Sequence, residues 1–300
     1  MDLQKYLSER GRLVEEALLK LMPPLTENPT VIHEALHYSV CAGGKRLRPI
    51  LCLAGVEALG RDPVRLLPIA GVLELIHTYS LIHDDLPAMD NDDYRRGKLT
   101  NHKCYGEGIA ILAGDALLTL AFEALSNFGL AQAEKEPAFC LQILRVINEI
   151  AEASGTMGMI GGQVVDIQSE GKSIDGKALE YIHTHKTGAL FRASVRAGAR
   201  LSGASQEDLA ALTAYSEYFG LAFQITDDIL DVSGNSAKMG KSVGSDLKKQ
   251  KATYPAIYGL EKAHLMASEA INGARASLLK LPGDTKPLEE IVNYLLERES

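Results

Sequence analysis

The 300-residue chain contains no tryptophan, only 6% aromatic residues and four cysteines. No two cysteines form a C-x-x-C pair, so the chain has neither the spacing of a common zinc site nor the dense disulfide framework of a small secreted domain. The N-terminal segment lacks the uninterrupted apolar core of a signal peptide. No segment reaches the roughly 18 consecutive apolar residues that a membrane span needs. We therefore expect a cytoplasmic protein with free thiols and no stable membrane insertion.

The chain also has no surplus of positive charge. Its formal net charge is -8, whereas nucleic-acid binding needs an excess of Lys and Arg on one face. Signals for β-structure are scarce too, because alternating runs of Val, Ile and Thr are absent and hairpin dipeptides nearly so. These absences argue against nucleic acid as a partner and against a fold built on sheets.

What the chain does contain is helical periodicity. Apolar residues recur every three or four positions, for example at Leu209, Leu212, Tyr215 and Phe219. Clusters of Gly and Pro divide the chain into segments of about 15 to 25 residues, longer than the usual helix of about 11 or 12. No stretch has the composition of a linker. We predict an all-α fold in which residues 1–300 form a single-domain bundle of long helices around a central active-site cavity.

The most unusual segment is SLIHDDLPAMDNDDYRRG, which places five aspartates within residues 84–93, directly after an apolar run. Carboxylates crowded beside a core destabilise the fold unless a cation lies among them. Pro87 disfavours helix at Leu86, so the helix should end or kink there. The chain can then turn back and bring Asp90 beside Asp84.

A second acidic cluster follows another apolar run, in QITDDILD. Asp227 and Asp231 are four residues apart, which places both carboxylates on one helix face. One acidic cluster alone is more often a solvated helix end than a metal site. Two clusters, each at the end of a buried helix, would form a carboxylate-lined cavity that needs a divalent cation. Oxygen ligands favour Mg²⁺, Mn²⁺ or Ca²⁺ over zinc, and substrate phosphates usually complete the ligands of Mg²⁺.

Cationic residues gather near glycine-rich turns and near these carboxylates. In GGKRLRP, Gly43 and Gly44 give a permissive backbone, and Lys45 and Arg48 should share one helical face. The other candidates are Arg95, Arg96, Lys186, Lys241 and Lys251. Each alone is more often a solvated surface charge. Together they suit two diphosphate groups, one held through Mg²⁺ and one held directly by Arg and Lys.

The histidines support an alternative from a different class. Four Glu-x-x-His pairs have the spacing used by di-iron carboxylate bundle proteins, namely Glu34/His37, Glu74/His77, Glu180/His183 and Glu261/His264. A di-iron protein would leave both aspartate clusters and the basic residues without a role. We therefore place it second.

The motifs DDLPAMD and DDILD resemble the first and second aspartate-rich motifs of the trans-isoprenyl diphosphate synthases. The similarity continues through GGKRLRP, GDAL, GGQVVD, HKTGAL, FQITDDILD and TYPA, in the order of the family and from about residue 40 to 260. It is greatest to the bacterial farnesyl diphosphate synthases. The resemblance implies an all-α fold, usually a homodimer, and a Mg²⁺-dependent prenyltransferase for which Mn²⁺ is a possible substitute. Such an enzyme condenses isopentenyl diphosphate with the allylic substrates dimethylallyl and geranyl diphosphate to give farnesyl diphosphate.

Position by position, the resemblance also implies roles for individual residues. Asp84, Asp90 and Asp227 would bind Mg²⁺, supported by Asp85, Asp228 and Asp231. Lys45, Arg48, His77 and Arg96 would hold isopentenyl diphosphate. Arg95, Lys186, Thr187, Gln224, Lys241 and Lys251 would surround the allylic diphosphate, although Gln250 stands where relatives commonly have glycine. With three Mg²⁺ ions, these cations would stabilise the departing diphosphate while the apolar interior keeps water from the carbocation.

Product length is expected to depend on the residues just before the first cluster. Ser80 lies one turn before Asp84, and Tyr79 occupies the fifth position before it. In the family this fifth position often forms the floor of the product cavity, and an aromatic residue there resembles synthases that stop at fifteen carbons. A tyrosine at such a place is also ordinary core. A geranylgeranyl diphosphate synthase, with a twenty-carbon product, remains the alternative within the family, and the preferred primer stays open.

Overall fold

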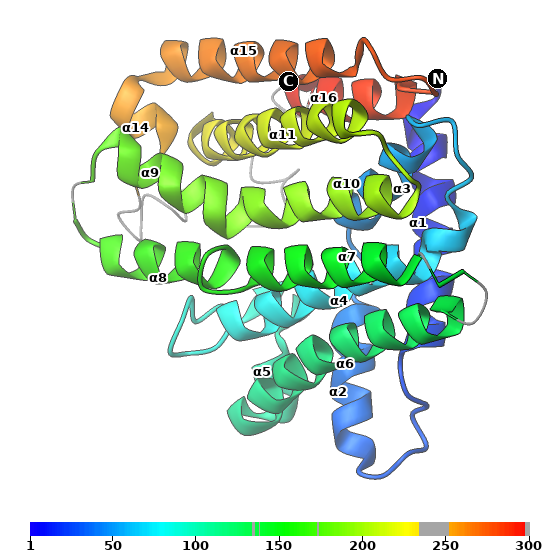
Figure 1. The fold of residues 1–300 in the computed structure, drawn as a ribbon. Helices are drawn as coiled ribbons and strands as arrows, with labels where there is room; N and C mark the ends of the chain where they lie inside the picture. The colour runs from blue at the N-terminus through cyan, green and yellow to red at the C-terminus, as the bar shows by residue number, and fades with distance from the viewer. Residues whose placement is uncertain (134–135, 138, 173, 234–251, 298–300) are drawn as a thin grey trace.

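The computed structural model describes residues 1–133, 136–137, 139–172, 174–233 and 252–297, and these residues are almost entirely α-helical (Figure 1). The first half contains α1 (Leu3–Leu21), α2 (Thr30–Val40), α3 (Leu47–Glu57), the 3₁₀ turn η1 (Val64–Leu66), α4 (Leu67–Asp84), α5 (Asn101–Tyr105) and α6 (Glu107–Ala133). The second half contains α7 (Phe139–Ser154), α8 (Met159–Ser169), α9 (Gly176–Ile182), the π-helix η2 (His183–Gly188), α10 (Ala189–Leu201), α11 (Gln206–Ser233), α14 (Tyr254–Tyr258), α15 (Leu260–Leu278) and α16 (Lys286–Glu297). The all-α prediction is confirmed.

Helix α4 lies at the centre of one half of the core. Its sequence, LPIAGVLELIHTYSLIHD, is apolar on nearly all sides, which is typical of a helix surrounded by other helices. It packs against α1, α3 and α6, and its buried residues belong to a hydrophobic cluster shared with α6 and α7. A second cluster joins α3, α10, α11, α15 and α16. The two clusters meet where α10 packs against α3 and α4.

The carboxyl ends of α4 and α11 point to the same end of the bundle, at the left of Figure 1, where η2 also lies. The two acidic clusters sit at these helix ends and therefore share one end of the molecule. Helix lengths vary more widely than the predicted 15 to 25 residues: α11 has 28 residues, whereas α2, α3 and α8 have 11 each. One cause is a turn at residues 155–158, which separates α7 from α8 although the two follow one line in Figure 1.

A short β-hairpin follows the first acidic cluster and was not expected from the sequence. Strand β1 (Tyr94–Arg95) pairs antiparallel with β2 (Lys98–Leu99). The turn residues Arg96 and Gly97 have φ values of 53° and 75°, the positive pair that a two-residue hairpin loop requires. The usual sequence signal for such a loop is Asn-Gly or Asp-Gly. The loop here is Arg96-Gly97, so the sequence did not predict the hairpin. This hairpin carries the two consecutive arginines.

By length and composition alone, two helical stretches of the described residues meet the criterion for a membrane span. In the first, Val64–Asp84, 67% of the apolar window is buried inside the protein, as expected of a core helix. In α6 only 39% is buried, and Ile111, Leu112 and Leu130 are exposed. Helix α6 therefore carries an apolar face that the other described residues leave uncovered.

Candidate active site

The first acidic cluster forms at the end of α4. The helix stops at Asp84, three residues before Pro87, and the backbone N–H of Asp90 donates to the carbonyl of Asp84 at 2.8 Å. The chain therefore turns back as the sequence predicts, and Asp90 lies close enough to Asp84 to influence its charge. The predicted helix end and return are confirmed.

Asp84 and Asp85 have different surroundings although they are adjacent. Burial raises the pKa of Asp84 to about 6, a shift that Lys186 opposes and Asp90 reinforces. Asp85 is only 3% exposed and is bound by Arg95, whose Nε donates to both carboxylate oxygens at 2.7 and 2.9 Å. Burial still raises the pKa of Asp85, against the effect of Arg95. A cation beside Asp84 would relieve the cost of its charge, whereas Asp85 already has a partner.

The second acidic cluster lies on the last turns of α11, and Asp228 is its most constrained member. Asp228 is 4% exposed and accepts the backbone N–H of Tyr254 at 2.9 Å and the side-chain amide of Gln224 at 3.3 Å. The ring Nε2 of His183 lies 3.6 Å from the same carboxylate. Asp231 is 8% exposed, and Asp227 is partly exposed. Asp228 thus fastens α11 to α14, and η2 lies beside it.

The π-helix η2 links the two acidic clusters. His183 extends toward Asp228, while Lys186, three residues later, lies near enough to Asp84 to lower its pKa and forms an ion pair with Asp166 of α8 at 2.6 Å. Thr187 follows in the same turn and is partly exposed. Short π-helical turns are frequent at functional sites.

A glycine in α8 explains how η2 can approach so closely. At Gly162 any Cβ atom would collide with the backbone of Lys186, so only glycine lets α8 and η2 pack at this distance. Asp166 lies four residues further along α8 and therefore on the same face as Gly162. The GGQVVD motif thus combines a close approach with an acidic partner for Lys186.

A basic cluster, made of Arg48, His77 and Arg96, lies near the start of α3 and the turn of the hairpin. The guanidinium of Arg48 is 4.4 Å from the ring centre of Phe191, and burial lowers its pKa to about 10. Burial and then the charges of Arg48 and Arg96 lower the pKa of His77 well below its usual value, so its ring is neutral. Arg96 donates to the carbonyl of Gly43. A cluster of this composition could bind an anion, with the histidine as a neutral hydrogen-bond donor.

One detail of the predicted basic set is wrong. Lys45 and Arg48 do not share a helical face, because α3 begins only at Leu47 and Arg46 adopts a left-handed backbone with φ of 49°. Lys45 is exposed, while Arg46 points inward and is 4% exposed. Only Arg48 belongs to the helix.

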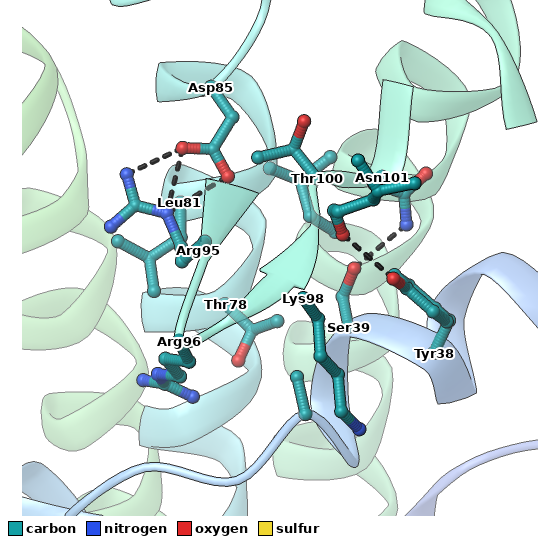
Figure 2. A pocket seen from close by; sticks show the side chains of 13 residues that line it. Tyr38, Ser39, Thr78, Leu81, Asp85, Arg95, Arg96, Lys98, Thr100 and Asn101 are labelled. Carbon is teal, nitrogen blue, oxygen red and sulfur yellow. Dashed lines mark hydrogen bonds and ion pairs between the residues drawn. The ribbon is translucent and has the colours of Figure 1, made fainter. Parts of the chain in front are cut away.

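The two arginines of the hairpin belong to different clusters, Arg95 to the first acidic cluster and Arg96 to the basic cluster. Figure 2 shows a pocket beside the hairpin, with Arg95 reaching Asp85 and Arg96 extending away from that ion pair. Arg95 ends strand β1, whereas Arg96 lies in the turn with a left-handed backbone, so the two side chains leave the chain in different directions. The pocket also holds Thr78 and Asn101, each with a buried oxygen that has no hydrogen-bond partner among the described residues.

The donor set at Asp84 fits a divalent cation that is completed from outside the protein. Among the described residues, no three His, Cys, Asp or Glu side chains lie close enough to enclose an ion by themselves. Mg²⁺ commonly takes one or two carboxylates and fills its remaining positions with water and substrate phosphates. A buried carboxylate with a raised pKa, close to Asp90, is a suitable ligand for such an ion.

Among the residues that the structure describes, the Glu and His side chains of the Glu-x-x-His pairs do not gather into a di-iron site. Glu74 is bound to Arg46 at 2.6 Å, and His37 interacts with the carbonyl of Pro23 at 2.9 Å. The four Glu-x-x-His pairs lie on α2, α4, the α9–η2 junction and α15, and the first two thus have other partners.

The candidate floor residue is buried beneath the first cluster. Tyr79 is 5% exposed, its ring lies edge-on to His83 at 5.8 Å, and burial raises its pKa to about 12. Its hydroxyl is buried without a hydrogen-bond partner among the described residues. The hydroxyl of Ser80 donates to the carbonyl of His77 at 2.9 Å.

Sequence reasoning missed three residues of this region and assigned two that cannot be placed. Asp166, His183 and Glu74 had no predicted role in binding, although GGQVVD and the Glu-x-x-His spacing pointed to their segments. Lys241 and Lys251 lie outside the described residues, so their assignment stays a prediction.

Comparison with known proteins places these features in a family. The polyprenyl synthetase family model matches residues 29–293. The chain is 48% identical over 300 residues to a geranylgeranyl diphosphate synthase of Cyanophora paradoxa, covering 100% of this chain and 97% of the relative. It is 46% identical over 299 residues to a farnesyl diphosphate synthase of Geobacillus stearothermophilus, covering 100% and 99%. The fold is similar to the crystal structure of an FPP/GFPP synthase from Zymomonas mobilis, with a TM-score of 0.85, 35% identity and 98% coverage of both chains.

Proposed function

The chain belongs to the polyprenyl synthetase family, and we propose that it is a Mg²⁺-dependent farnesyl diphosphate synthase. In this proposal it condenses isopentenyl diphosphate first with dimethylallyl diphosphate and then with geranyl diphosphate. The observation that carries the proposal is the η2 bridge, because one turn brings Lys186 toward the first aspartate cluster and His183 toward the second. An allylic diphosphate bound between the clusters would meet Lys186 as its oxygen departs.

Each group of residues has a distinct task in this reaction. Asp84, Asp90 and Asp227 would hold Mg²⁺, which would neutralise the charge that builds on the departing diphosphate. Lys186 contributes a cation on the same side, with Arg95, Thr187 and Gln224 around the allylic group. Fixed charges of this kind lower the barrier to ionisation of the allylic carbon–oxygen bond because they need no reorganisation.

The second substrate would occupy the basic cluster. Arg48 and Arg96 would bind the diphosphate of isopentenyl diphosphate directly, Lys45 would reach it from the exposed loop, and neutral His77 would donate a hydrogen bond. The double bond of this substrate then attacks the allylic carbocation, and the released diphosphate takes the proton that is lost. The apolar walls keep water away from the cation until the new carbon–carbon bond has formed.

Tyr79 supports the fifteen-carbon product. A buried phenol without a hydrogen-bond partner is unusual in a core, where Phe would pack as well without leaving a polar atom unpaired. The large side chain of Tyr79 is explained if it forms the wall that stops the growing prenyl chain. A twenty-carbon product is the second candidate, since the relatives include both farnesyl and geranylgeranyl diphosphate synthases at similar identity.

We also propose that the protein is a cytoplasmic homodimer that uses the exposed apolar face of α6. Ile111 and Leu112 on this face are 44% and 55% exposed. Exposed apolar patches of this kind typically mark an interface. If analytical ultracentrifugation at micromolar concentration shows a monomer, the proposed homodimer is contradicted.

The test is an incubation of metal-stripped protein with dimethylallyl and isopentenyl diphosphates, with and without Mg²⁺, followed by mass spectrometry of the product. A fifteen-carbon diphosphate that forms only with Mg²⁺ is the expected result. Tyr79→Ala and Tyr79→Met should lengthen the product, whereas Tyr218→Ala, at a tyrosine that is 42% exposed on α11, should leave it unchanged. A twenty-carbon product from the unaltered protein would overturn the product assignment, and no product with any divalent cation would overturn the activity.

A further inference from the structure

Arg46 is the residue of GGKRLRP whose charged side chain is buried in the protein. Its side chain is 3% exposed, and its backbone is in the left-handed region with φ of 49°, which a non-glycine residue rarely adopts. Such a conformation persists only where surrounding contacts maintain it. The side-chain contacts come from the guanidinium, and the carbonyl of Arg46 also accepts the backbone N–H of Ile50 at 3.0 Å.

The guanidinium of Arg46 joins several helices at one point. Its Nη1 donates to Glu74 of α4 at 2.6 Å, and its Nη2 donates to the carbonyl of Val40, the last residue of α2, at 2.6 Å. Glu15 of α1 lies 3.8 Å from the same nitrogen. Arg46 itself precedes α3, so the start of α3 is fixed relative to three other helices.

The position of Glu74 connects this junction to the anion site. Glu74 is 1% exposed as a side chain and precedes His77 by one turn on α4, so the residue that anchors Arg46 shares its helix with a proposed ligand of isopentenyl diphosphate. Lys45 and Arg48 flank Arg46 in the chain. Any rotation of Arg46 would therefore move both of these cations relative to His77.

We propose that Arg46 and Glu74 are positioning residues for isopentenyl diphosphate, which hold Lys45, Arg48 and His77 in the arrangement that binds its diphosphate. The pair does not touch the substrate. This role rests on the proposed function, because it presumes that the basic cluster binds that substrate. A buried ion pair is weak evidence for stability in itself, since apolar residues of similar volume often replace one without loss.

Because apolar residues of similar volume can replace a buried ion pair, a double substitution is the decisive variant. The double substitution Arg46→Met with Glu74→Met removes a pair that is neutral overall, so the net charge near the diphosphate is kept while the positioning contacts are lost. The fold should survive, and a thermal unfolding curve checks that it does. We expect the KM for isopentenyl diphosphate to rise about tenfold or more, the scale seen when a supporting partner of a binding residue is lost. The KM for the allylic substrate and kcat at saturation should stay within about twofold.

Two single variants and a matched pair complete the design. Glu74→Gln keeps an acceptor for Arg46 and should preserve the KM for isopentenyl diphosphate. Arg46→Lys keeps the charge but replaces the two guanidinium nitrogens that bind Glu74 and Val40 with a single nitrogen on a flexible chain. It should raise that KM severalfold even if the double variant does not fold. The control is Arg10→Met with Glu57→Met, an Arg–Glu pair between α1 and the far end of α3. It should leave both KM values unchanged.

Calorimetric titration with isopentenyl diphosphate alone separates this inference from the proposed function. Weaker binding in the double variant, with the control unchanged, supports positioning whether or not the protein forms product. The inference is overturned by a folded double variant, or an Arg46→Lys variant, that binds isopentenyl diphosphate like the unaltered protein. It is also overturned by equal losses for both substrates, or by equal losses in the control pair, because these indicate general loosening of α3. Absence of heat with the unaltered protein would overturn both the site and the role given to Arg46.

Discussion

The two aspartate clusters look alike in the sequence but differ in how each holds its charge. In the first cluster, Asp85 is neutralised by Arg95 and the adjacent Asp84 is left with a pKa raised to about 6. In the second, Asp228 is held by a backbone N–H and a side-chain amide, and the ring of His183 lies 3.6 Å away. In both Asp-Asp pairs the second aspartate is committed to protein partners. The comparison teaches that the second member of each pair is held by protein contacts, while the first is the proposed ligand of the cation.

The sharpest way to break this comparison is to neutralise the members of each pair separately. Asp84→Asn and Asp227→Asn should each lower kcat/KM by roughly 10³-fold or more, because each removes a proposed ligand of the cation that would stabilise the leaving diphosphate. Asp85→Asn and Asp228→Asn should cost about 10- to 100-fold, as supporting residues do. Steady-state condensation assays at saturating Mg²⁺ measure all four. Equal losses within a pair would show that its two members do not have separate roles.

The second prediction concerns the bridge between the clusters. Lys186→Gln should lower kcat by about 10²- to 10³-fold, the loss seen when one donor to a developing charge is removed. Lys172→Gln is the matched control, since Lys172 is an exposed lysine whose side chain, among the described residues, donates to the carbonyl of Gln168 of its own segment. Single-turnover measurements separate the chemical step from product release. A Lys186 variant that changes KM alone would place this residue in binding and not in catalysis.

The third prediction uses the raised pKa of Asp84. Below about pH 6 its carboxylate is protonated, so a proton competes with the cation and Mg²⁺ affinity should fall by up to about tenfold per pH unit. NMR titration of the apo protein with labelled aspartate should show one carboxyl that titrates near 6 and disappears in Asp84→Asn. If that resonance instead titrates near 4, burial does not raise the pKa of Asp84, and this prediction is wrong.

The smallest expected effect is on stability, and it has opposite signs in the two clusters. The pKa of Asp84 is higher in the folded state than its ordinary value of 3.8, so its contribution favours folding at low pH and is lost as pH rises from about 4 to about 6. At pH 7.5 without metal, Asp84→Asn should therefore raise Tm by about 2 to 4 °C, the scale of about 1 kcal/mol in a large domain. At pH 4 the difference should vanish.

Asp228→Ala is the counterpart in the second cluster. It leaves the buried backbone N–H of Tyr254 without its acceptor, which costs about 1 to 3 kcal/mol and should lower Tm. Scanning calorimetry of the apo proteins compares the two variants directly. A lower Tm for Asp84→Asn at pH 7.5 would contradict the asymmetry between the clusters.

The sequence was sufficient for features that depend on local spacing. Helical periodicity predicted the fold class, Pro87 predicted the end of α4, and the return of Asp90 followed from that end. Arg46 was not predictable in this way, because its inward direction depends on a left-handed backbone after two glycines and on partners far away in the chain. Helical spacing wrongly predicted that Lys45 and Arg48 share one helical face, because α3 begins only at Leu47.

The π-helix and the hairpin were missed for related reasons. The turn at η2 forms because α8 and α11 approach it through Gly162 and Gly220, contacts that no local pattern reveals. The hairpin loop uses Arg96 in a conformation usually taken by Asn or Gly, and its contact with Gly43 comes from a distant segment. Both features carry residues of the proposed site, where local preferences are most often overridden.

The most direct test of the account is whether both aspartate clusters are needed to hold one metal-bound diphosphate. Diphosphate would be titrated calorimetrically into protein saturated with isopentenyl diphosphate, with and without Mg²⁺, for the unaltered chain, Asp84→Asn and Asp227→Asn. The account predicts tight binding only with Mg²⁺ and loss of that binding in either variant. Binding of equal strength without Mg²⁺, or undiminished binding in one of the two variants, would contradict it.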